Sequence, residues 1–574
     1  MGTERRQMKR AGTTNGRLLV ISILGSAFAA GTLALGMHYA GLETYPLLAS
    51  MPYRKLVFYL LIAALFFAAC LGIYQFGKHG KKLIDTLGRK NPLPAVSITF
   101  SAKSIVASTV VVLVLWLPWI AVEYPASIDW DTYNQLYQFF TPAPTYYSTM
   151  GTVFDAEYID HHPVFDTLIF GSFVWLGNVV GSQNMGMFLY ALLQCAFTAA
   201  ALSLSCCYLD KLGVPKPIRL SLLVFVAIFP PIPNWAMCMC KDSLFSAVFI
   251  LYFVAFIEIV RTKGAALGSK RFLACYVILS GLCILTKKPG VYIFILSGFV
   301  LLVVYRRFWK RTLVALIAPL LLFSFAFPAV VYPLIGGVAS GGKQEMLGTF
   351  FQQTATYLLE HDDATAEELE TIKKVMNIDA AKERWNPQIS DPAKNSFQAD
   401  ASFSDIVDYF KVWAIQGTRH PVSYLKATCC TSVQGFSPAK TMGWHTTCNP
   451  GKSALEMFSE ASDAITIHKP EALNVASSKI EKAYKKILNH MPVANWIFSQ
   501  GFYGGWLPML CILMALYNDK RNLIPFVPIL GSWVFLIMTP TVADRYILPF
   551  LYAAPLLIGL ACHSFTQKNA NVPR

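Results

Sequence analysis

Hydrophobic residues in this chain gather into long uninterrupted blocks instead of alternating with polar ones. Most of these blocks have about the 20 residues that an α-helix needs to cross a bilayer. Thirteen such blocks occupy residues 18–40, 56–76, 104–122, 164–180, 185–209, 220–236, 243–260, 272–285, 289–305, 313–331, 493–517, 523–538 and 546–565. The pattern predicts an α-helical polytopic membrane protein.

The basic connections between the blocks set the number of crossings. If all thirteen blocks cross from a cytoplasmic N-terminus, the basic loops 211–219, 261–271, 306–311 and 520–521 fall outside, against the positive-inside rule. They move to the cytoplasm if block 164–180 lies along the outer surface. We therefore predict about 12 transmembrane helices, one juxtamembrane helix over 164–180, and cytoplasmic N- and C-termini.

Four regions follow from this topology. Residues 1–103 hold two helices and a basic cytoplasmic loop, and residues 104–335 form a membrane core whose acidic outer loop spans 123–183. Residues 336–491 carry more than half of the carboxylates and stretches of helical periodicity, which predicts a mostly helical extracytoplasmic domain. Residues 492–574 supply the C-terminal transmembrane helices.

Composition agrees with a membrane protein and argues against a nucleic-acid partner. The chain has 574 residues, of which 55% are hydrophobic and only 14% charged. A net charge of +15 could suggest a nucleic-acid partner. However, the surplus bases lie mainly in short connections between apolar blocks, as expected of cytoplasmic loops in a bilayer. We expect no nucleic-acid binding.

One stretch of the chain is acidic without any local base. No lysine or arginine occurs between Lys103 and Lys211. The same stretch contains eight carboxylates, and seven of them lie before residue 170: Glu123, Asp129, Asp131, Asp155, Glu157, Asp160 and Asp166. The eighth, Asp210, directly precedes Lys211. Their counter-ions have to come from elsewhere in the chain or from a bound cation.

Bases at the predicted outer helix ends are candidates for that role. Each is followed by an apolar run, so it could hold a lipid phosphate whose tail enters the bilayer. The simpler alternative is an interfacial anchor whose stem reaches to the headgroups. The candidates for donor and phosphate binding are Lys241, Asp242, Lys287, Lys288, Arg545 and Tyr546.

The acidic loop also contains candidates for catalysis. Asp129 and Asp131 bracket a tryptophan, and His161 and His162 follow some thirty residues later. A carboxylate there could accept a proton from an acceptor hydroxyl, and an imidazole could bind phosphate or transfer a proton. Helix capping is the simpler role for the aspartates. Asp129, Asp131, Asp160 and His162 would alternatively suit Mg²⁺ or Mn²⁺.

The order of these motifs resembles the GT-C superfamily of membrane glycosyltransferases, which use polyprenyl-phosphate-linked sugars as donors. It is most similar to a bacterial branch reading Asp-(Ser/Thr)-x-x-Gln, His-His-Pro and Lys-Asp, matched here at residues 131–135, 161–163 and 241–242. The resemblance covers about residues 104–565. It implies that Asp131 or Asp129 is the general base, and that Lys287, Lys288 and Arg545 stabilise the leaving phosphate.

Three functions remain open at this stage. The first is transfer of a sugar from a polyprenyl-phosphate donor to a cell-envelope glycan, lipid or protein at the outer face of the cytoplasmic membrane. The second is a transporter or flippase for a lipid-linked or anionic substrate, although the charges gather at one surface and not near the midplane. The third is a non-catalytic scaffold, which leaves the clustered charges unexplained.

Overall fold

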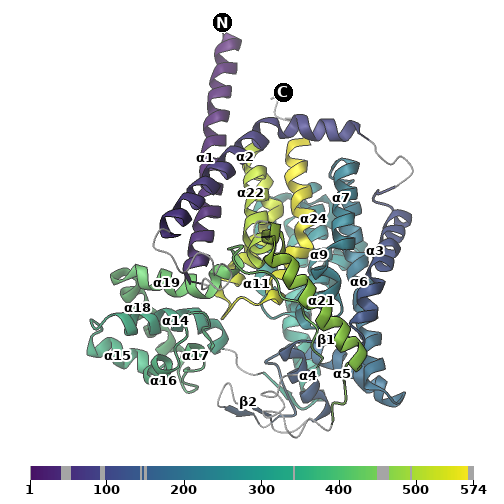
Figure 1. The fold of residues 1–574 in the computed structure, drawn as a ribbon. Coiled ribbons are helices and arrows are strands. Elements are labelled where there is room, and N and C mark those ends of the chain that lie inside the picture. Colours follow the sequence, from purple (N-terminus) through teal and green to yellow (C-terminus); the bar gives the residue numbers. More distant parts are fainter. Residues whose placement is uncertain are drawn as a thin grey trace.

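The computed structural model describes residues 2–39, 54–90, 97–141, 145–147, 152–154, 156–339, 343–448, 464–491 and 494–566, and most of these are helical (Figure 1). Within them, 8 helices are long and apolar enough to cross a membrane. Three further apolar helices are shorter: Val164–Val179, Gly290–Val304 and Phe502–Asn518.

The helices group into a bundle and an outer region, with only two- and three-residue strands between them. The bundle contains α1 (Gly2–Tyr39), α2 (Arg54–Arg89), α3 (Ala102–Val122), α5 (Val164–Val179), α6 (Gln183–Tyr208), α7 (Lys216–Ile228), α8 (Pro231–Ala236), α9 (Lys241–Arg261), η3 (Ala265–Gly268), α10 (Lys270–Thr286), α11 (Gly290–Val304), η4 (Arg306–Phe308), α12 (Trp309–Pro319), η5 (Leu320–Ala326), α13 (Phe327–Leu334), η8 (Ala494–Phe498), η9 (Phe502–Trp506), α22 (Leu507–Asn518), η10 (Lys520–Phe526), α23 (Val527–Met538) and α24 (Asp544–Thr566). The outer region contains α4 (Trp130–Phe140), α14 (Lys343–Glu360), α15 (Ala366–Lys373), α16 (Ile378–Glu383), α17 (Asp391–Lys394), α18 (Phe403–Arg419), α19 (Pro421–Ser432), η6 (Val433–Gly435) and α21 (Glu471–Asn489). The strands are β1 (Ser127–Ile128), β2 (Thr145–Tyr147), β3 (Thr152–Phe154), β4 (Tyr158–Ile159), β5 (Cys238–Met239) and β6 (Gly337–Val338).

Helices α24 and α9 form the centre of the bundle. The most apolar window of α24 is 89% buried and that of α9 is 78% buried, whereas the window in α3 is 22% buried. The apolar surfaces of α24 and α9 are therefore covered by protein, whereas that of α3 is left to face lipid. The central helices begin at Lys241 and Asp544, next to two of the predicted basic motifs.

The predicted block 220–236 is a broken helix. Helix α7 ends at Ile228, and prolines at 230, 231 and 233 precede or begin the short α8. Proline lacks the amide donor that would continue a helix, so the chain turns here. It then forms β5, which pairs in parallel with β1 through Ser127 with Cys238 and Ile128 with Met239.

Helix α5 coincides with the predicted juxtamembrane segment and does not run the length of the bundle. Its beginning lies beside the start of α9, because His162 contacts Lys241. Its end is joined by a tight turn to the start of α6. Helices α6 and α9 run in parallel, since Tyr208 at the end of α6 donates a 2.7 Å hydrogen bond to Glu258 near the end of α9. Helix α5 therefore packs antiparallel along the first half of α6, since Phe170 and Phe173 contact Tyr190 and Gly177 contacts Gly186.

The predicted outer domain over 336–491 divides into two parts. Residues 343–424 have a hydrophobic core of their own, built around Phe351, Tyr357 and Tyr409. In contrast, Met442 and Ile467 belong to the core of the bundle. These described residues of the later part therefore pack on the bundle. Within the first part, Thr365 caps α15 in a capping box with Glu368.

The predicted cytoplasmic loop 78–90 is helical. Helix α2 continues to Arg89, and in Figure 1 this second half lies across the end of the bundle where α24 finishes. Strand β1 and helix α4 lie at the opposite end.

Candidate functional site

The short β1–β5 pairing places the first turns of α4 and α9 side by side. Thr132 strengthens the junction by donating a 2.6 Å hydrogen bond from Oγ1 to the carbonyl oxygen of Met239. Asp129 is the N-cap of α4 and accepts a 2.7 Å hydrogen bond from the amide of Trp130. The capping role predicted for Asp129 is thus confirmed, and its second oxygen remains available to other groups.

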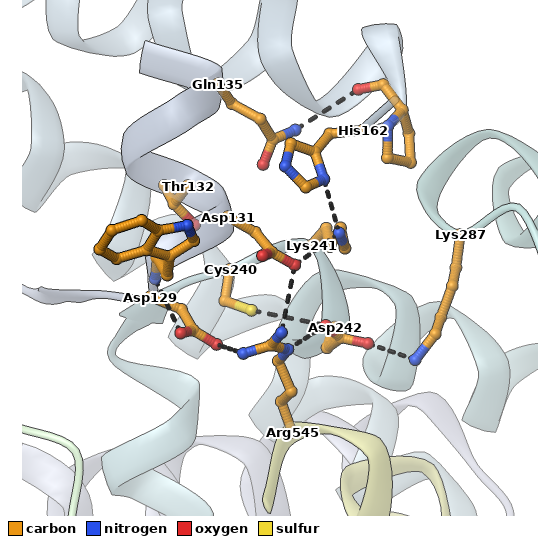
Figure 2. Close-up of polar contacts among 12 residues, drawn as sticks. Asp129, Asp131, Thr132, Gln135, His162, Cys240, Lys241, Asp242, Lys287 and Arg545 are labelled. Atoms are coloured by element: carbon orange, nitrogen blue, oxygen red, sulfur yellow. Dashed lines mark hydrogen bonds and ion pairs between the residues drawn. The ribbon is translucent and has the colours of Figure 1, made fainter. Parts of the chain in front are cut away.

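Lys241 joins the two predicted motifs of the acidic loop (Figure 2). Its ammonium donates to Asp131 Oδ2 at 2.6 Å and to His162 Nδ1 at 3.0 Å. Burial raises the pKa of Asp131, but Lys241 and Arg545 outweigh it and hold that pKa well below its usual range. Burial together with the Lys241 charge holds the pKa of His162 well below its usual range.

The tautomer of His162 follows from this contact. A lysine ammonium has only donors, so Nδ1 of His162 accepts and the ring proton resides on Nε2. That Nε2 is buried and has no hydrogen-bond partner among the described residues. The site therefore contains a buried donor ready for an acceptor atom.

Arg545, in the first turn of α24, connects three carboxylates. Its Nη1 donates to Asp129 Oδ2 at 2.5 Å, and its Nη2 lies 3.4 Å from Asp131 Oδ2. Its Nε lies 3.5 Å from Asp242 Oδ2 and, in the part of the chain that the structure describes, makes no hydrogen bond. A second donor in the same site is therefore unsatisfied.

Lys287 lies on the other side of Asp242 (Figure 2). It forms an ion pair with Asp242, and both side chains are buried. Its ammonium also lies 4.8 Å from the ring centroid of Tyr546 and 4.9 Å from that of Phe535. This places Lys287 in an apolar, aromatic environment, where a charge interacts strongly with any anion that enters.

The remaining predicted residues lie beside this cluster. Lys288 is exposed and pairs with Asp160 at 3.2 Å, and Tyr332 donates to the other oxygen of Asp160 at 3.2 Å. The rings of His161 and His162 are 4.7 Å apart, and burial lowers the pKa of His161 to about 4. The turn that carries these histidines follows β4, which pairs in parallel with β6.

The acidic stretch thus receives its counter-ions from far along the chain, as predicted. Besides the pairs above, Lys469 binds Glu123 at 2.7 Å, a contact that no sequence motif indicated. Asp166 is fully buried, and neither of its carboxylate oxygens has a hydrogen-bond partner within the described ranges. Asp155 lies outside the described residues.

The predicted metal site is not supported by the geometry. Asp129, Asp131, Asp160 and His162 do not converge, and among the described residues no three His, Cys, Asp or Glu side chains are placed to hold a metal ion. The reason is that the ammonium of Lys241 lies between Asp131 and His162, where a Mg²⁺ or Mn²⁺ ion would have to bind.

A cavity of about 190 Å³ opens beside Asp129 and Arg545. Sequence reasoning missed most of its lining, because the residues belong to no motif and come from distant segments. The lining residues are Asp129, Trp235, Gly443, Trp444, His445, Ala543, Asp544 and Arg545. This cavity gives the charged cluster access to a small polar substrate.

Two contacts fix the position of the His445 ring in this cavity. Its ring stacks on that of Trp235 at 5.1 Å, and its Nε2 donates to the carbonyl oxygen of Ile128 at 2.7 Å. Burial disfavours its charge, but the Cys238 thiolate and then the Asp129 carboxylate raise the pKa of His445 to about 9. The neighbouring Asp129 carboxylate thus favours the protonated form of His445.

The formal charges of the cluster cancel. Three carboxylates (Asp129, Asp131 and Asp242) face three bases (Lys241, Lys287 and Arg545). Such a balanced network keeps several charges at a nonpolar boundary and preorganises them, which is how charged sites stabilise a developing anion. Its bases can hold an anion such as phosphate while a carboxylate accepts a proton.

The apolar helices and the polar site at one end of their bundle define an α-helical membrane protein. The chain belongs to the protein family described as "Family of unknown function (DUF6020)", whose model matches residues 86–573. That match includes every residue of the charged cluster. Comparison with curated proteins and with solved structures finds no match.

Proposed function

We propose that this protein is a membrane glycosyltransferase of the GT-C type, which moves a sugar from a polyprenyl-phosphate donor to a cell-envelope acceptor. The observation that carries the proposal is the convergence of Asp129 with Arg545 and Lys287 beside a cavity at the end of apolar helices. A lipid-linked donor would place its tail among the helices and its phosphate at this end.

Arg545 is the base that the donor phosphate would meet in the cavity. It lines the cavity, and its Nε is buried without a hydrogen-bond partner in the described structure. A phosphate oxygen that accepted from this guanidinium would remove the free-energy cost of leaving the donor unpaired. Lys287 adds positive charge in a poorly hydrated environment and stabilises the leaving phosphate as the glycosidic C–O bond breaks.

Of the two aspartates, Asp129 is better suited to act as the general base. It lines the cavity, whereas Asp131 is buried behind it. The pKa of Asp131 is held well below its usual range by Lys241 and Arg545, despite burial, so Asp131 is a weak proton acceptor. Asp129 would take the proton of the acceptor hydroxyl while that oxygen attacks the anomeric carbon, and the configuration would invert.

The aromatic wall of the cavity suits a sugar. Trp235 and Trp444 offer apolar ring faces, and Asp544 offers carboxylate oxygens for hydroxyl groups. A volume of about 190 Å³ is of the size of a single sugar ring rather than a chain of them. We assign this cavity to the transferred sugar or to the accepting hydroxyl group.

The topology proposed for this function has twelve crossings, cytoplasmic termini and an outer active site in the cytoplasmic membrane. Support comes from α5, which packs along only the first half of α6, on the side of the bundle that holds the charged cluster, and so is too short to reach the opposite end. A transporter is disfavoured because Lys241, Lys287 and Arg545 lie with β1 and α4 at one end of the bundle, whereas transport sites lie near the bilayer midplane.

The catalytic test compares purified wild-type protein with Asp129→Asn on a panel of labelled polyprenyl-phosphate sugars and cell-envelope acceptors. Loss of the general base should lower the transfer rate by about 10² to 10⁴ with donor binding retained. Asp408→Asn is the matched control, since this carboxylate is exposed on α18. Absence of transfer by the wild type across the panel, or full activity of Asp129→Asn, would contradict the proposal.

A second experiment separates transport from transfer. In proteoliposomes, movement of a fluorescent polyprenyl-phosphate lipid between leaflets without sugar transfer would favour a flippase.

Topology is tested by impermeant maleimide labelling in a Cys275→Ser background, because Cys275 is exposed. Asn178→Cys should react from outside and Lys270→Cys only after permeabilisation. The reverse pattern would exclude an outer active site.

A further inference from the structure

A second cavity lies at the end of the bundle opposite the candidate site. It has a volume of about 560 Å³ and is formed where the second half of α2 crosses the start of α7 and the end of α24. In Figure 1 these elements meet at the end where α24 finishes, far from β1 and α4. The lining residues are Ile84, Asp85, Gly88, Arg89, Lys90, Gly213, Val214, Pro215, Lys216, Arg219 and Thr566.

The charge of this cavity is positive. Four of its lining residues are bases (Arg89, Lys90, Lys216 and Arg219), and one is an acid, Asp85. The N-terminus of α7, a helix of 13 residues, adds the positive end of its dipole. An anion entering the cavity would therefore be attracted from several directions.

Arg219 is the residue that makes this a built site and not just a basic surface. It is only 7% exposed, and its Nη1 forms an ion pair with Asp210. Its Nε is buried and has no hydrogen-bond partner in the described part of the chain. Leaving a charged donor unsatisfied is costly, and an oxygen of a ligand in the cavity would satisfy it.

The surroundings place this anion at a membrane surface. Helix α2 packs on the bundle here through Ile84, which is 3% exposed, and through the edge-on contact of Phe76 with Phe565. The same helix exposes Lys81 and Lys82. A surface helix with an apolar inner face and a basic outer face is typical of the boundary between lipid and water.

We propose that this cavity binds a phosphate group, with Arg219, Arg89 and Lys90 as its main ligands. The guanidinium groups match phosphate geometry, and the cavity is large enough for a phosphate with its glycerol substituent. The phosphate belongs either to the headgroup of an anionic lipid in the adjacent leaflet or to a soluble phosphate compound. The site is independent of the proposed transferase activity.

The experiment measures phosphate binding by the full-length protein in two arms. In the first arm, the protein is placed in nanodiscs with increasing phosphatidylglycerol in phosphatidylcholine, and its thermal midpoint and retained lipids are recorded by native mass spectrometry. In the second arm, the detergent-solubilised protein is titrated with inorganic phosphate and with glycerol 3-phosphate. Stabilisation confined to the first arm assigns the site to a lipid headgroup, and stabilisation in the second assigns it to a soluble phosphate.

Three variants decide whether this cavity is responsible. Arg219→Gln should weaken the apparent affinity about tenfold or more, as expected on removing a charge-assisted hydrogen bond. Arg89→Gln/Lys90→Gln changes exposed residues, so it tests the site even if Arg219→Gln fails to fold. Lys81→Gln/Lys82→Gln is the matched control on the same helix, outside the cavity. No stabilisation in either arm, or equal weakening in the control, overturns the proposal.

Discussion

Replacing Lys241 with methionine tests whether the candidate site is held together by its buried charges. Methionine keeps most of the length of the side chain and removes the ammonium. In this variant the one ion-pair partner that Asp131 retains among the described residues is the guanidinium of Arg545, at 3.4 Å, and His162 Nδ1 loses its donor. The variant thus leaves an undercompensated carboxylate in a largely buried position.

The expected magnitude follows from the geometry. Two unit charges about 4 Å apart attract by about 4 kcal/mol at an effective dielectric constant of about 20, and removing one partner of a buried pair costs roughly 3–5 kcal/mol. The side chains of Lys241 and Asp131 are 14% and 12% exposed, so we expect the lower end, about 3 kcal/mol. Adding Asp131→Asn removes the orphaned charge. The free energy of unfolding should therefore fall less in the double variant than the two single-variant losses added together. We expect the difference to be about 1.5 kcal/mol or more.

The assay is a double-mutant cycle on free energies of unfolding, measured by denaturant titration in mixed micelles after reversibility has been checked. The pair Lys411 and Asp408 serves as the control cycle, because it has a similar distance, 2.7 Å, but side chains that are 68% and 54% exposed. Its coupling should stay below about 0.5 kcal/mol. Additivity of Lys241→Met and Asp131→Asn within about 0.5 kcal/mol would refute the reasoning.

Three further predictions concern stability. Lys469→Met should destabilise the protein by about 3–5 kcal/mol, because Glu123 is 1% exposed and loses its ion-pair partner, and an unchanged denaturation midpoint would contradict this. Gly504→Ala should lower the free energy of unfolding by about 1–3 kcal/mol, since a Cβ there meets a carbonyl oxygen of η6. Gly72→Ala, on the open face of α2, is the control and should raise it by up to about 1 kcal/mol in the same titration. Burial lowers the pKa of His161 to about 4, so the unfolded chain binds the proton first and stability falls as the pH drops from about 6.5 towards 4. In the His161→Gln variant, the thermal midpoint should decrease less between pH 7 and pH 4 than in the wild type. Identical pH profiles of the two proteins would contradict this prediction.

Local features of the chain could be predicted because local interactions produce them. Apolar blocks indicated the helices, and the position of Asp129 just before a helical stretch indicated its role as a helix cap. The shortage of local bases indicated that Asp131 needed a distant counter-ion. Helix lengths were less predictable: α2 continues to Arg89 because its later turns pack on the bundle, a contact that hydropathy does not report.

By itself, the sequence determined the class of protein, the approximate helices and the set of charged residues that required partners. The tertiary structure decided which partners they received, since Lys241 reaches Asp131 across 110 residues and Arg545 reaches Asp129 across 416. It also decided that Lys241 occupies the place of a predicted metal ion and that His445 lines the cavity. Hydropathy and capping act over a few residues, whereas these contacts depend on how whole helices pack, and no local pattern encodes that packing.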